Sequence, residues 1–98
     1  MHVDVESTEA NLRVAFKHVA AGDTQAFSRL YDQLANASYS VCTEIDAAGR
    51  DRIMLATWMF VWVNAASLYA MNKPVEALVL SVARDVGAAG LNSRDRNL

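Results

Sequence analysis

Nineteen consecutive residues at positions 53–71, IMLATWMFVWVNAASLYAM, contain no Asp, Glu, Lys or Arg. A stretch of this kind forms a membrane span, the most buried helix of a small domain, or a helix that leaves one apolar face for a partner. The three alternatives correspond to a membrane protein, a small domain with a buried central helix and a protein that binds a partner. The stretch therefore limits the fold of the chain more than any other feature does.

The membrane alternative fits this stretch poorly. A membrane-spanning helix needs about 20 predominantly apolar residues, whereas Thr57, Asn64 and Ser67 interrupt the apolar pattern here. Lys73 and Pro74 follow closely and begin another amphipathic segment. We therefore expect the central helix of a bundle, covered by neighbouring helices over most of its surface and by a partner over the remaining apolar face.

The positions of glycine and proline divide the chain into four predicted helices. These helices cover about residues 7–21, 23–45, 50–69 and 74–87. The last one is expected to end at Gly87 or Gly90, and residues 1–6 and 92–98 are expected to be flexible. A single core accommodates about 50–200 residues, so residues 1–98 form one domain. We predict an all-α fold, a small bundle of about four helices.

The segment 23–45 shows the clearest helical period. Its apolar and weakly polar side chains recur at steps of one, three and four residues, which places them on one face of a helix. They are Phe27, Leu30, Tyr31, Leu34, Ser38, Val41, Cys42 and Ile45. Cys42 is predicted to be a small core residue of this face.

The charge and the cysteine content exclude several classes of protein. The formal net charge is −2, which argues against a protein that binds nucleic acid through an overall basic surface. Cys42 is the only cysteine, so no intramolecular disulfide can form. The first residues lack the apolar core of a signal peptide. We therefore expect a cytoplasmic protein.

The sequence has no pattern of catalytic or metal-binding residues. His2 and His18 lie far apart and have no neighbouring ligands. Glu44 and Asp46 stand at a predicted helix end without a nucleophile or a base beside them. We find no Ser-His-Asp set, P-loop or HExxH motif. The prediction is a protein that is not an enzyme, with no cofactor, metal or small-molecule substrate.

Three short motifs follow one another along the chain. They are GDTQAFSRLYDQLANASY at 22–39, VWVNA at 61–65 and PVEALVLSVARDVGAA at 74–89. Together they resemble region 2 of the sigma-70 family, especially its extracytoplasmic-function (ECF) branch, over about residues 19–89. The Gly-Asp turn, the Ala-Phe pair, the Leu-Tyr pair and a later Tyr match the start of that region. The resemblance implies a sigma region 2-like fold, a role in transcription initiation and RNA polymerase as a partner.

The chain departs from this family at positions that carry its contacts. The Gln-Glu pair that faces the β′ clamp helices of RNA polymerase falls on Leu55 and Ala56, and a basic residue of the third helix falls on Val63. The tryptophan of the fourth helix is Leu78. The basic residues that follow the Ala-Arg of that helix are Asp85, Val86 and Gly87. The sequence ends before any region 4, either as a short protein or as a fragment of a longer sigma factor.

The apolar third helix is the predicted partner interface. Its candidate residues are Leu55, Trp58, Met59 and Trp62. Trp58 and Trp62 are four residues apart and can act as a pair of aromatic anchors, or one of them can belong to the core. The expected occupant is RNA polymerase, a sigma factor, an anti-sigma factor or a second copy of the chain.

The connector after the third helix is the predicted promoter-DNA contact. Tyr69, Asn72 and Lys73 correspond to the ECF loop that captures a flipped base of the −10 element, so Tyr69 would stack on the base. Arg84, at the family's Ala-Arg position, would contact a phosphate. The alternatives are a plain helix–helix connector with Tyr69 packed on the bundle, and a surface ion pair for Arg84.

Three functional hypotheses follow from these features. The preferred one is a degenerate sigma region 2-like domain that regulates transcription initiation through protein contacts of its third helix. The second is a working sigma factor that binds the −10 promoter element and recruits RNA polymerase. The third is a purely structural bundle that dimerises.

Overall fold

A computed structural model describes the backbone of residues 8–96 and the side chains of residues 8–90. Within residues 8–96 the chain forms five helices and no strand. The helices are α1 (Glu9–Ala20), α2 (Thr24–Ile45), α3 (Arg50–Val63), α4 (Ala65–Ala70) and α5 (Val75–Arg96). The predicted all-α bundle is confirmed. The predictions for residues 1–6 and for His2 lie outside the described residues.

Asn64 divides the predicted third helix into two. Its backbone N–H donates to the Phe60 carbonyl at 2.9 Å, and its side-chain Nδ2 donates to the same oxygen at 3.0 Å. Asn side chains compete in this way with the regular hydrogen bonds of a helix. The prediction of one helix over 50–69 is therefore wrong, because α3 ends at Val63 and the short helix α4 begins at Ala65.

The predicted end of the last helix is also wrong, because α5 continues through Gly87 and Gly90 to Arg96. The predicted flexible tail from Asn92 is thus helical as far as Arg96. Gly87 serves packing rather than termination. A Cβ atom at Gly87 would lie 2.6 Å from Cγ2 of Ile45, so glycine allows α5 to approach the end of α2.

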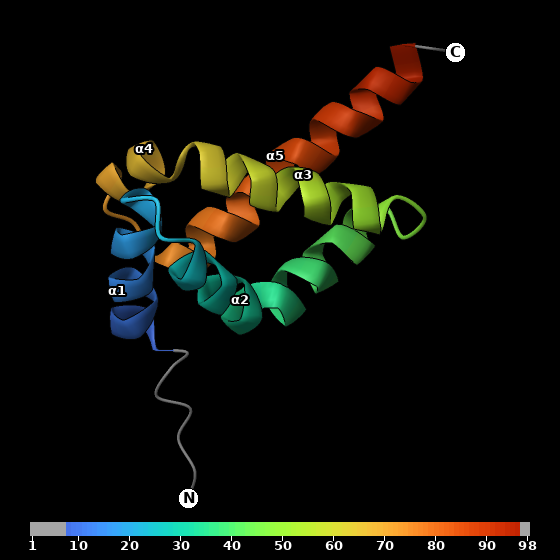
Figure 1. Ribbon diagram of the computed structural model, residues 1–98. Coiled ribbons are helices and arrows are strands. Elements are labelled where there is room, and N and C mark those ends of the chain that lie inside the picture. The colour runs from blue at the N-terminus through green and yellow to red at the C-terminus, as the bar shows by residue number, and fades with distance from the viewer. Residues whose placement is uncertain (1–7, 97–98) are drawn as a thin grey trace, which may run out of the picture.

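Each of the long helices contacts several others. Helices α2 and α3 are joined by the turn at 46–49 and run in opposite directions, and α5 passes behind them and contacts both (Figure 1). Helix α1 closes one end of the bundle against α2, α4 and α5. The C-terminal part of α5 extends beyond the other helices. No helix in the described range is both long enough and apolar enough to span a bilayer.

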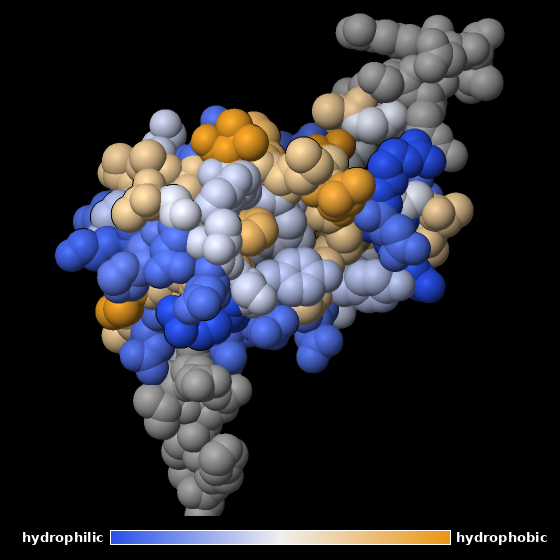
Figure 2. Space-filling view, viewed as in Figure 1, coloured by the Kyte–Doolittle hydropathy of each residue, from blue (hydrophilic) through white to orange (hydrophobic). Residues whose placement is uncertain are grey.

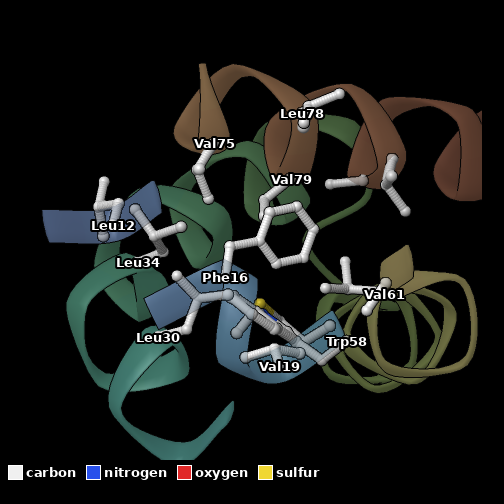
Figure 3. Packing of buried hydrophobic residues seen from close by; sticks show 14 of the residues in the cluster. Leu12, Phe16, Val19, Leu30, Leu34, Trp58, Val61, Val75, Leu78 and Val79 are labelled. Atoms are coloured by element: carbon white, nitrogen blue, oxygen red, sulfur yellow. The ribbon is translucent and has the colours of Figure 1, made fainter. Parts of the chain in front are cut away.

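The core is built around the fully buried ring of Phe16 (Figure 3). Side chains from α1, α2, α3 and α5 surround it. The labelled members of this cluster are Leu12, Val19, Leu30, Leu34, Trp58, Val61, Val75, Leu78 and Val79. Cys42 is fully buried, as predicted, and burial raises the pKa of its thiol. Ser38, on the same stripe of α2, is buried as well.

Candidate partner interface on α3

Helix α3 has an apolar face on each side. The inner face packs on the bundle and consists of Ile53, Met54, Thr57, Trp58 and Val61. The opposite side, the outer α3 face, consists of Leu55, Ala56, Met59, Phe60 and Val63. Its four large side chains are 64%, 58%, 45% and 73% exposed in the order Leu55, Met59, Phe60 and Val63. Monomers rarely expose so many large apolar groups on one helix.

The outer α3 face is a continuous ridge. Leu55, Met59 and Val63 follow one another at four-residue spacing, and Ala56 and Phe60 form the adjacent row. From Leu55 to Val63 the ridge is about 12 Å long, in a helix of fourteen residues. Hydrophobic residues gather along the α3 and α4 edge of the molecule, whereas hydrophilic residues predominate over α1 in the same view (Figure 2).

An aromatic groove lies beside the first half of the ridge. Its volume is about 280 Å³, and its lining residues come from α2 and α3. They are Tyr31, Tyr39, Asp51, Met54, Leu55 and Trp58. The guanidinium of Arg50 lies 5.0 Å from the centre of the Tyr39 ring. The groove therefore combines apolar walls with one carboxylate and one cation at its edge, and Leu55 belongs both to the groove and to the ridge.

The structure separates the four residues that were predicted to form the interface. Leu55 and Met59 lie on the outer α3 face. Trp58 is only 5% exposed and belongs to the core, the alternative that the sequence left open for one of the two tryptophans. Trp62 is half-buried and packs against the core cluster.

The two tryptophans contact aromatic rings of α2. Phe27 lies 5.9 Å from Trp58 and 5.0 Å from Trp62, measured between ring centres. Tyr31 lies 5.1 Å from Trp58 on the same measure. The two contacts of Trp58 are edge-to-face and that of Trp62 is tilted, and together they fasten α3 to α2. Of the two tryptophans, Trp58 thus lies in the core, and Trp62 is partly buried beside Phe27.

Phe60 and Val63 belong to the exposed face but were not among the interface residues predicted from the sequence. Both continue the helical spacing from Leu55 and Ala56, so periodicity contains the signal. The inner face has the same spacing and equally apolar residues. Without a charged side chain between 53 and 71, periodicity cannot tell which of the two faces points outward.

The connector between α4 and α5 is held against α1. The Arg13 guanidinium lies 4.3 Å from the centre of the Tyr69 ring and donates to the Tyr69 carbonyl at 3.0 Å and the Lys73 carbonyl at 3.4 Å. Phe16 meets the Tyr69 ring edge-on at 6.0 Å. Glu9 Oε1 accepts a hydrogen bond of 2.7 Å from the N–H of Val75. Tyr69 is thus packed on the bundle, the alternative to a freely exposed ring.

The other DNA-contact candidates are exposed. Asn72 adopts a left-handed conformation with φ of 56°, and Lys73 follows it at the surface. Arg84 is exposed on α5, about 14 Å along the helix axis from Val75, the first residue of α5. It forms no ion pair with the residues that the structure describes. The fold therefore groups Tyr69, Asn72 and Lys73 in one connector and leaves Arg84 apart from them.

Among the residues that the structure describes, no group of three His, Cys, Asp or Glu side chains is placed to hold a metal ion. A cavity of about 510 Å³ lies between α1 and α2, with Leu12 and Leu30 in its lining and with His18, Arg29 and Asp32 among its polar groups.

Comparisons with protein-family models, with curated proteins and with solved structures found no match to this chain.

Proposed function

We propose that the protein is a helical interaction module of the cytoplasm that regulates transcription initiation by binding a protein partner through the outer α3 face. The observation that carries this proposal is the exposure of four large apolar side chains along one uncharged ridge of α3. Large contiguous apolar patches on the surface of a soluble protein mark sites of interaction.

Burial of this ridge supplies the driving force for binding. Each Å² of apolar surface that leaves water contributes about 25 cal/mol, less the cost of association. Leu55 also borders the aromatic groove, which offers a pocket for one apolar side chain of the partner. An apolar ridge beside a groove fits a partner with an apolar helix or strand rather than a nucleic acid.

The transcription part of the proposal rests on the sigma region 2 resemblance. In that family the clamp of RNA polymerase faces a Gln-Glu pair whose positions here are Leu55 and Ala56. Both residues are exposed on the outer α3 face. The polymerase-facing position of the family thus coincides with the apolar ridge of this chain. RNA polymerase, a sigma factor or an anti-sigma factor with an apolar surface is the expected partner.

A pull-down from the native cell tests this proposal with a matched pair of variants. Met59 and Val14 are both 58% exposed, but Val14 lies on α1. The wild type and Val14→Glu are expected to capture RNA polymerase, a sigma factor or an anti-sigma factor, identified by mass spectrometry, and Met59→Glu is expected to lose it. Capture of none of these proteins, or equal capture by Met59→Glu, would overturn the proposal.

Promoter binding by the connector is a second candidate function, favoured by the exposure of Asn72 and Lys73. A gel shift with single-stranded −10 oligonucleotides and added RNA polymerase, at two salt concentrations, tests it. Binding at low salt that disappears in Lys73→Ala would favour this function. An absence of binding at low salt would exclude it.

A further inference from the structure

The cavity between α1 and α2 is separate from the outer α3 face. All of its lining residues belong to these two helices, and its volume of about 510 Å³ falls within the range of small-molecule sites, about 300–1,000 Å³. Leu12 and Leu30 in the lining are almost completely buried, and Ala15 is half-buried. Val14, also in the lining, is 58% exposed, so the cavity offers apolar surface to a ligand.

Three side chains with different charges line the same cavity. Arg29 and Asp32 come from α2, and His18 comes from the last turn of α1. Arg29 and Asp32 are three residues apart, a spacing that commonly permits an ion pair on one helix. Within residues 8–90, however, none of the three side chains forms a hydrogen bond or an ion pair. Their polar atoms are therefore available to a ligand.

The two ends of the cavity differ in their chemistry. His18 on α1 and Arg29 on α2 are the polar lining residues nearest to the turn at 21–23. Asp32 lies one helical turn further, about 4.5 Å along the axis of α2. Guanidinium and imidazole N–H groups bind a carboxylate, whereas a carboxylate binds an ammonium group. The cavity thus has a donor end and an acceptor end, at a separation that suits a small molecule with both charges.

We propose that this cavity binds a free α-amino acid with an apolar side chain. The carboxylate of the ligand pairs with Arg29, and its ammonium group pairs with Asp32. Its side chain covers the apolar lining around Leu12 and Leu30, which supplies the hydrophobic part of the binding free energy.

The two protein charges select this ligand over simpler amphipathic molecules. A fatty acid would bring a second carboxylate close to Asp32, and an alkylamine would bring a second cation close to Arg29. Like charges at such distances are unfavourable. A residue inside a peptide chain has neither charged group. The amino acid is bound unchanged, so this site adds a ligand to the proposed function without making the protein an enzyme.

Three probes that differ in one charge each test the proposal on the full chain. They are L-leucine, L-leucinamide, which lacks the carboxylate, and N-acetyl-L-leucine, which lacks the ammonium group. Amide chemical shifts of residues 11–18 and 29–33 report binding at the cavity by NMR titration. Leucine is expected to bind about five-fold more tightly than either analogue, as two exposed ion pairs allow.

Two variants assign the charges to their partners. Arg29→Gln is expected to bind leucine and leucinamide equally, because it no longer recognises the carboxylate. Asp32→Asn is expected to bind leucine and N-acetyl-leucine equally, because it no longer recognises the ammonium group. A merely structural role of either residue would weaken all three probes alike. Arg84→Gln, at an exposed position of α5, is the matched control and keeps the wild-type preference.

The titrations decide the result independently of the outer α3 face. No shift in the cavity amides up to the solubility limit of leucine would overturn the proposal, as would equal binding of the three probes by the wild type. Met59→Glu, which is expected to lose its transcription partner, is expected to bind leucine as the wild type does. The ligand site and the partner interface can therefore fail separately.

Discussion

Thr57 and Trp58 are neighbours on the inner face of α3, and only Trp58 forms a side-chain hydrogen bond within the described part of the chain. The indole N–H of Trp58 donates to Ser38 Oγ at 3.4 Å, and that hydroxyl donates to the Leu34 carbonyl at 2.7 Å. Thr57 Oγ1 is buried without a hydrogen-bond partner in the described part of the chain. Buried polar groups are normally paired, so this hydroxyl weakens the core.

Replacement of Thr57 by valine is expected to stabilise the protein. Thr57→Val keeps the shape of the side chain and removes the unpaired hydroxyl, which should raise the free energy of unfolding by about 1 kcal/mol. Urea denaturation measures the change. Thr43→Val is the control, because Thr43 is only partly buried and its Oγ1 already donates to the Tyr39 carbonyl at 2.9 Å. A Thr57→Val protein that unfolds at lower urea than the wild type would contradict the prediction.

At the scale of elements, two contacts help to position α5, in addition to the packing of Val75, Leu78 and Val79 in the core. Glu9 and Arg13, one turn apart on α1, hold the start of α5 and its preceding connector through Val75, Tyr69 and Lys73. Farther along, Gly87 allows α5 to pass close to Ile45 at the end of α2. The first contact is polar and the second depends on the absence of a side chain.

Loss of the Arg13 side chain is expected to loosen the connector. Arg13→Ala removes two hydrogen bonds and the cation–π contact with Tyr69, which together should lower the free energy of unfolding by about 1–2 kcal/mol. Hydrogen exchange should accelerate at the amides of residues 71–73 before those of α2. Lys17→Ala, at an exposed position of the same helix, is the control. Unchanged exchange in the connector of Arg13→Ala would show that this contact does not hold it.

Replacing each of two glycines of α5 by alanine is expected to change the stability of the protein in opposite directions. Gly87→Ala would force a Cβ atom against Ile45 and should cost about 1–3 kcal/mol of stability through overpacking. Gly90→Ala meets nothing within 4 Å and should stabilise the helix by up to about 1 kcal/mol. Thermal unfolding compares the two variants.

A double variant checks the cause of the Gly87 effect. In an Ile45→Ala background the cost of Gly87→Ala should largely disappear, because the side chain that it strikes has been shortened. An equal cost in both backgrounds would mean that the close approach to Ile45 is not the reason.

At the scale of the whole molecule, the outer α3 face can link stability to protein concentration, because a second copy of the chain is one of the occupants expected from the sequence. A partner that binds only the folded chain raises the unfolding temperature as its concentration increases. The Tm of the wild type should therefore rise with protein concentration, whereas that of Met59→Glu should stay constant. Differential scanning calorimetry over a range of concentrations measures both. A wild-type Tm independent of concentration would argue against self-pairing.

The sequence by itself determined the helices and much of the core. In α2, apolar residues alternate with polar ones at helical spacing, so the buried positions Leu30, Leu34, Ser38 and Cys42 could be predicted. The break at Asn64 and the continuation of α5 past Gly87 could not. Asparagine and glycine occur both inside helices and at their ends. At Asn64 the side-chain hydrogen bond to the Phe60 carbonyl accompanies the end of α3, and at Gly87 the close approach of Ile45 accounts for a glycine inside α5.

Only the tertiary structure decided which side of α3 is exposed. The sequence identified the helix as the candidate interface and placed Leu55 and Met59 in it, but it could not exclude Trp58 or select Val63. An amphipathic helix is oriented by its charged residues, and none lies between 53 and 71. The orientation comes instead from shape, because the rings of Phe27 and Tyr31 on α2 pack against Trp58 and leave the opposite ridge in solvent.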